Sequence, residues 1–297
     1  MTLDERLHND IEELKNKKEI SAAVKLAEII KPKDAKSDSH RFSTRGVPHY
    51  YYGKRDKDTS TVVVNLNPGK AAKLSDEEFE IKYYTKLTKQ PIDLFIEDYH
   101  KAQGTYETKD GNAADSFDVK QAAFLTPWKD SGIGLPSNPD WDDSQTRNTA
   151  AQIVVSNKLQ LELVPYASAK FDFRSSKVNL LFPYVDTILD EIFAQKRTYI
   201  IFASRKFEYI FKRYNMECKN IFEFPKYDKT EPKTEPENRP LKDGGTLKGK
   251  CKVIYINYNG ERRKALIAHT FPSQALSRAF KLMQTYGEIC YKEWCNK

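Results

Sequence analysis

Two short turns hold the residues of this chain whose types and spacing could do chemistry. The first, residues 65–69 with the sequence Asn-Leu-Asn-Pro-Gly, directly follows the apolar run 61–64. That run predicts a buried strand. Pro68 fixes one backbone φ angle and Gly69 lets the backbone approach a ligand closely, so we expect a sharp turn there. Turns at the carboxyl end of a central strand are where open α/β sheets bind their ligands.

The second turn, residues 269–277, has the sequence His-Thr-Phe-Pro-Ser-Gln-Ala-Leu-Ser. It follows the apolar run 264–268, and Asn259-Gly260 separates that run from another at 252–257. Asn-Gly between two apolar runs predicts a β-hairpin. The second turn is therefore expected to end the last strand and to lead into a closing helix.

The remaining elements must position these two turns. Helices are predicted at 3–30, 76–87, 92–101, 149–155, 185–193, 207–214 and 273–294, and further strands at 122–125, 159–166 and 198–203. Strands separated by helices favour the α/β class: a three-layer α/β/α sandwich around a central, mainly parallel sheet. We expect one domain over residues 1–297, with a helical N-terminal extension (1–45) and a flexible polar insertion (225–250).

Composition limits the classes of partner. The chain has 297 residues and a formal charge of +7, a mild basic excess that permits a polyanion as partner. No apolar run is long enough to span a membrane and no signal sequence is evident, so the expected location is the cytoplasm. None of the four cysteines forms a C-x-x-C pair, so no metal site is expected. Residues 47–55 mix aromatic and basic side chains, which suits either base stacking or a strand at the sheet edge.

Taken in order, the two turns resemble the motifs of the uracil-DNA glycosylase superfamily. Its members carry G-x-N-P-G or G-Q-D-P-Y after the first strand, and (H/N)-P-S-x-L-S after the last. The first turn is most similar to the Asn-Pro-Gly form of the thymine/mismatch-specific branch. The resemblance covers the core, residues 61–280. Asn65 stands where the family usually has glycine, and Phe271 where it has His or Asn.

The resemblance implies a monofunctional DNA glycosylase that needs no cofactor and no obligate protein partner. Such an enzyme hydrolyses the N-glycosidic bond of a flipped, damaged or modified pyrimidine in DNA and leaves an abasic site. Asn67 would position the attacking water, with rate coming mainly from electrostatic stabilisation. His269, two positions before Phe271, would donate a hydrogen bond to the departing base. Its alternative is a strand-end histidine bonded to the backbone.

Further residues take binding roles on the same resemblance. The expected substrate-binding residues are Asn65, Pro68, Gly69, Trp128, Glu162, Tyr166 and Phe271. The expected contacts to DNA phosphate are Lys70, Ser273 and Ser277. Alternatives stay open here: Trp128 suits an ordinary core position, and Glu162, between two leucines, suits an outward-facing one.

The residues after the first turn bear on the substrate. In the uracil-specific branch a tyrosine there blocks bases with a 5-substituent, whereas this chain has Lys-Ala-Ala at 70–72. A larger base, such as a hypermodified cytosine of phage DNA met in anti-phage defence, would therefore fit. A P-loop, a G-x-G-x-x-G cofactor site and a G-x-S-x-G elbow are all missing from the sequence. The alternative function is a non-catalytic DNA- or protein-binding module of the same fold.

Overall fold

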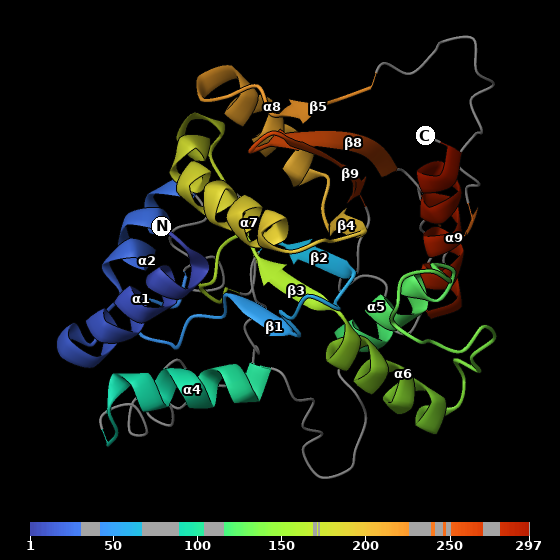
Figure 1. Ribbon diagram of the computed structural model, residues 1–297, viewed down its shortest axis with the longest axis horizontal. Helices are drawn as coiled ribbons and strands as arrows, with labels where there is room; N and C mark the ends of the chain where they lie inside the picture. The colour runs from blue at the N-terminus through green and yellow to red at the C-terminus, as the bar shows by residue number, and fades with distance from the viewer. Residues whose placement is uncertain are drawn as a thin grey trace. The chain divides into compact units, whose positions relative to one another are not determined.

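The computed structural model describes residues 1–30, 42–66, 89–103, 116–168, 171, 173–225, 239–240, 246–247, 251–269 and 280–296. Seven of the described strands form one sheet in the order β1-β3-β2-β4-β9-β8-β5 (Figure 1). Their bounds are β1 (Tyr51–Gly53), β2 (Thr61–Asn65), β3 (Leu159–Glu162), β4 (Tyr199–Phe202), β5 (Phe222–Glu223), β8 (Cys251–Tyr258) and β9 (Glu261–Ala268). Strands β6 (Arg239–Pro240) and β7 (Thr246–Leu247) form a separate pair.

The predicted α/β class is confirmed, and the sheet is mixed. Its centre is mostly parallel: β4 pairs with β9 in parallel, and β8 then pairs with β9 and β5 in antiparallel fashion. The α-helices described are α1 (Leu3–Lys17), α2 (Ser21–Leu26), α4 (Ile92–Gln103), α5 (Ser116–Leu125), α6 (Ser144–Asn157), α7 (Phe182–Ala194), α8 (Lys206–Glu217) and α9 (Phe280–Asn296).

The order of the strands reverses at β2. The chain passes from β2 to β3 on one side of it, and then to β4 on the other side. In open α/β sheets such a reversal is where ligands bind, outside the carboxyl ends of the strands. The predicted first turn begins at the carboxyl end of this strand, with Asn65 as the last residue of β2.

Contacts divide the chain into two compact units. One comprises Met1–Tyr52, Val64–Gly104 and Gln160–Gln195, and the other Gly53–Val63, Thr105–Leu159 and Lys196–Lys297. In the first unit, α1 packs against α2, α4 and α7 (Figure 1). A capping box at Thr2 and Glu5 starts α1, and Lys18 ends it in the left-handed conformation (φ 60°). The predicted single helix over 3–30 is therefore wrong, because the chain breaks into α1, α2 and a 3-10 turn.

The second unit is built around α5, which packs against α6 and α9. Residues 122–125 lie in α5, so the predicted strand there is wrong. This apolar run is buried throughout, and a helix packed against two others has few polar positions to reveal its period. Gly287 permits the approach of α9, because a Cβ at this position would meet the carbonyl oxygen of Phe124 at 2.0 Å.

The predicted hairpin is confirmed. Strands β8 and β9 pair from Cys251↔Ala268 to Tyr258↔Glu261, and Asn259 and Gly260 at the turn have φ angles of 49° and 80°. Positive φ at both central residues is the requirement of the tight hairpin turn that Asn-Gly favours. This register also places Cys251 and Lys252 opposite the end of β9, which His269 follows.

Candidate functional site

The first cluster of polar side chains lies in the first unit, where β2 and β3 end. Backbone hydrogen bonds continue past both strands, from Leu163 N to Asn65 O and from Val164 N to Leu66 O, each 2.9 Å long. The second bond lies one residue further along both segments than the first, so the two segments run in the same direction. Asn65 and Glu162, two residues predicted to bind substrate, are thereby brought side by side.

The carboxylate of Glu162 is the acceptor of this cluster. Its Oε1 accepts hydrogen bonds from Asn65 Nδ2 (3.1 Å) and from Gln160 Nε2 (2.7 Å). All three residues are less than 8% exposed. Burying a carboxylate or an amide is unfavourable unless hydrogen bonds replace its water, and here Oε1 of Glu162 accepts from both buried amides. The bond to Glu162 fixes the amide orientation of Asn65 two positions before Asn67.

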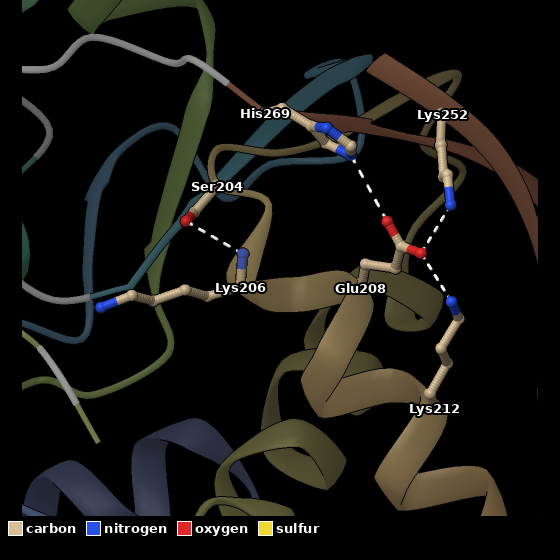
Figure 2. Close-up of polar contacts among 6 residues, drawn as sticks. All are labelled: Ser204, Lys206, Glu208, Lys212, Lys252 and His269. Carbon is tan, nitrogen blue, oxygen red and sulfur yellow. Dashed lines mark hydrogen bonds and ion pairs between the residues drawn. The ribbon is translucent and has the colours of Figure 1, made fainter. Parts of the chain in front are cut away.

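The second cluster lies in the second unit, around Glu208 in the first turn of α8 (Figure 2). Glu208 Oε1 accepts hydrogen bonds from Lys212 Nζ (2.6 Å) and Lys252 Nζ (2.5 Å). Its other oxygen, Oε2, lies 3.5 Å from His269 Nε2. That separation is the distance of an ion pair once the imidazole is protonated, and it exceeds the usual range for an N–H···O bond.

Electrostatics in this cluster favour an ionised carboxylate. Partial burial on its own raises the pKa of Glu208, but the hydrogen bonds and positive charges of Lys212 and Lys252 outweigh it, so the pKa is lowered. Figure 2 also shows Ser204 in the turn before α8, where its Oγ accepts a hydrogen bond from the Lys206 backbone N–H (3.2 Å). The arrangement gives His269 an anionic neighbour within a cationic surrounding.

Tyr166 and Trp128, two further residues predicted to bind substrate, belong to neither polar cluster. Tyr166 donates its hydroxyl hydrogen bond to Asp10 of α1 at 2.9 Å, and Tyr50 donates to the same carboxylate oxygen at 2.7 Å. Burial raises the pKa of Asp10 to about 6, although both hydroxyls act against it. Trp128 is 1% exposed in the core of the second unit, where four aromatic rings pack against its ring. These rings belong to Phe124, Tyr199, Tyr291 and Trp294.

The other predicted site residues lie outside the described residues. They are Asn67, Pro68, Gly69, Lys70, Phe271, Ser273 and Ser277. Of the residues the sequence singled out, the structure thus brings Asn65 together with Glu162. It gives His269 a partner, Glu208, that the sequence analysis did not consider.

Sequence reasoning missed Gln160 and Glu208. Gln160 alternates with leucines in β3 and shares the face of Glu162, two positions later, so period-2 spacing could have paired them. Glu208 stands in the first turn of the helix after β4, and Lys212 follows it at i+4. This spacing reads as an ordinary surface ion pair, and the proximity of His269 comes from the tertiary fold alone.

Comparison with protein-family models, with curated proteins and with solved structures finds no match to this chain. Within the described ranges, no group of three or more His, Cys, Asp or Glu side chains is arranged to hold a metal ion. Among the helices that the structure describes, none has the length and apolar character that crossing a bilayer requires.

Proposed function

We propose that this protein is a monofunctional DNA glycosylase with a uracil-DNA-glycosylase-like α/β/α fold, acting on a flipped modified pyrimidine. The observation that carries the proposal is the buried Asn65–Glu162 pair at the carboxyl end of β2. It stands where the strand order reverses, and Asn65 is two positions before the start of Asn67-Pro68-Gly69. A buried polar pair at that point would anchor the start of the proposed ligand-binding turn.

The reaction needs little covalent chemistry from the protein. The bond between C1′ and the base nitrogen breaks, and its electron pair leaves with the base. Water adds to C1′ through its oxygen, one proton of that water is released to solvent, and the base anion takes up a proton. Asn67 would orient the water, and donors that meet the negative charge on the departing base would lower the barrier.

The composition of the first turn supports a base larger than uracil. Residues 70–72, Lys-Ala-Ala, carry no aromatic ring that could exclude a substituent at the 5-position. A 5-substituted cytosine, including the hypermodified cytosines of phage DNA, is therefore the substrate class we propose. DNA is the proposed partner, and the basic excess of the chain favours its binding at low salt.

Abasic-site formation tests the proposal. The protein is incubated with duplex and single-stranded oligonucleotides that carry uracil, mismatched thymine or 5-modified cytosine, and alkali then converts abasic sites to strand breaks. We expect breaks at modified cytosine that Asn67→Ala lowers by about 10²-fold or more. Asn9→Ala, an exposed asparagine on α1, is the matched control and should retain full activity.

Two outcomes would count against the proposal. Binding to these oligonucleotides without breaks on any of them would instead identify a non-catalytic DNA-binding module. Release of uracil alone, with no modified pyrimidine, would leave a glycosylase but reject the proposed substrate class.

A further inference from the structure

The two carboxylate oxygens of Glu208 have separate neighbours. Oε1 accepts from both lysines, whereas Oε2 faces His269 Nε2 (Figure 2). Both lysines bond one oxygen, so they hold the carboxylate in one orientation and leave the other oxygen directed at the imidazole. The side chains of Glu208 and His269 are 18% and 17% exposed, so water weakens their interaction less than it would on an open surface.

The nitrogen of His269 that faces Glu208 determines which tautomer of the neutral ring is favoured. A carboxylate beside Nε2 favours a proton on that nitrogen. The neutral ring would then carry no proton on Nδ1. To donate from Nδ1 to a departing base, His269 must therefore be the imidazolium, with protons on both nitrogens. An anionic Glu208 stabilises that form, and Lys212 and Lys252 oppose it.

We propose that Glu208 is a positioning residue for His269: it orients the ring through Nε2 and stabilises the imidazolium that donates to the departing base. This inference rests on the proposed glycosylase function for its final step only. The charged groups that the described residues bring to this cluster are Glu208 and Lys212 from α8 and Lys252 from β8. They act on the ring in the absence of substrate as well.

Hairpin register supports this assignment of neighbours. Lys252 pairs with Ile267, and His269 comes two positions after Ile267. Side chains two positions apart in extended chain share a face of the sheet, so Lys252 and His269 are expected on the same side. Figure 2 shows both directed toward Glu208. The carboxylate is thus held by a helix on one side and by the hairpin on the other.

NMR titration of the His269 ring tests the electrostatic step on the intact protein without substrate. In Glu208→Gln, we expect the midpoint to move to lower pH by about one unit, because one opposite charge is lost while two like charges remain. In Lys252→Gln it should move the other way. Glu217→Gln, which removes the same charge from the far end of α8, is the control and should leave the midpoint unchanged.

The opposite signs exclude a merely structural effect, because a loosened fold would not move the two midpoints in opposite directions. Unchanged midpoints in both Glu208→Gln and Lys252→Gln would overturn the proposal. If Glu208→Gln did not fold, Glu208→Asp would take its place, since the shorter side chain withdraws the carboxylate from the imidazole and should also lower the midpoint.

Activity then tests the catalytic step. The wild-type rate of abasic-site formation should fall as pH rises through the His269 titration, and in Glu208→Gln that fall should occur at lower pH. At neutral pH the Glu208→Gln rate should be about 10- to 100-fold lower, less than the roughly 10²–10⁴-fold that a positioned acid supplies, because His269 itself remains. Wild-type protein that forms no abasic site would refute the proposed function, while the NMR result would still report the Glu208–His269 coupling. An identical pH profile in both proteins would overturn the positioning role.

Discussion

Gly287 of α9 lies directly against Phe124 of α5: a Cβ on Gly287 would meet the Phe124 carbonyl oxygen at 2.0 Å and its Cα at 3.1 Å. The contact involves backbone, which cannot rotate away as a side chain can. In an exposed helix, Gly→Ala stabilises by about 0.5–1 kcal/mol. Here the displacement of α9 from α5 costs more than that gain.

We therefore predict that Gly287→Ala lowers the free energy of unfolding by about 1–3 kcal/mol. Urea denaturation followed by circular dichroism gives the value. Glu288→Ala, at the next and exposed position of α9, is the control and should change stability by less than about 0.5 kcal/mol. Equal stabilities of Gly287→Ala and wild type would show that the two helices do not pack this closely.

The raised pKa of Asp10 should make the free energy of unfolding depend on pH. Its carboxyl has a folded pKa of about 6 against 3.8 when unfolded, chiefly because of burial. A raised folded pKa contributes stability that is complete below pH 3.8 and is lost as pH rises through 6. The change amounts to about 3 kcal/mol at 1.36 kcal/mol for each pKa unit.

Asp10→Asn should remove this dependence. Compared with the wild type, the variant should gain stability progressively between pH 4 and pH 6 and keep the gain above pH 6. The comparison must be between the two proteins, because burial lowers the pKa of His49 to about 4 and its contribution has the opposite sign over the same interval. Thermal melts at pH 4, 5, 6 and 7 measure the difference. A difference that does not vary with pH would contradict the prediction.

Two substitutions of Glu162 should differ in their effect on stability. Glu162→Leu leaves the buried amides of Asn65 and Gln160 without their acceptor, and we expect a loss of about 2–4 kcal/mol. Glu162→Gln keeps a carbonyl oxygen that can accept from both, so its stability should stay within about 1 kcal/mol of the wild type. Chemical denaturation of the two variants side by side measures this. Similar losses in both would mean that the negative charge, not the acceptor, holds the cluster.

Sequence patterns gave the right elements where a local rule determines them. The Asn259-Gly260 turn needs positive φ at two positions, and few other residues allow it, so the hairpin was predictable. Residues 122–125 were not, because a short apolar run fits a buried strand and a buried helix equally well. For Glu162, alternation with leucines indicates a half-buried strand, yet all four residues of β3 are buried, so both faces of this strand are covered.

The candidate site, too, could be predicted only in part. Asn65 and Glu162 were predicted as substrate-binding residues from the resemblance, and their proximity agrees with the rule that parallel strands end at one edge of the sheet. The contact of Glu208 with His269 joins residues on α8 and after β9, and no local pattern specifies such a pairing. Only the packed structure determines which side chains of distant segments meet.

The Asn259-Gly260 turn also governs charge at the opposite end of its hairpin. A slip of one residue between β8 and β9 would send Lys252 to the other face of the sheet, while His269 kept its own. Glu208 would then hold one lysine instead of two, and its carboxylate would have greater freedom to rotate. Because the length of a hairpin turn helps to set this register, inserting one residue into the turn is expected to change the proton affinity of His269. No side chain in contact with His269 would be substituted.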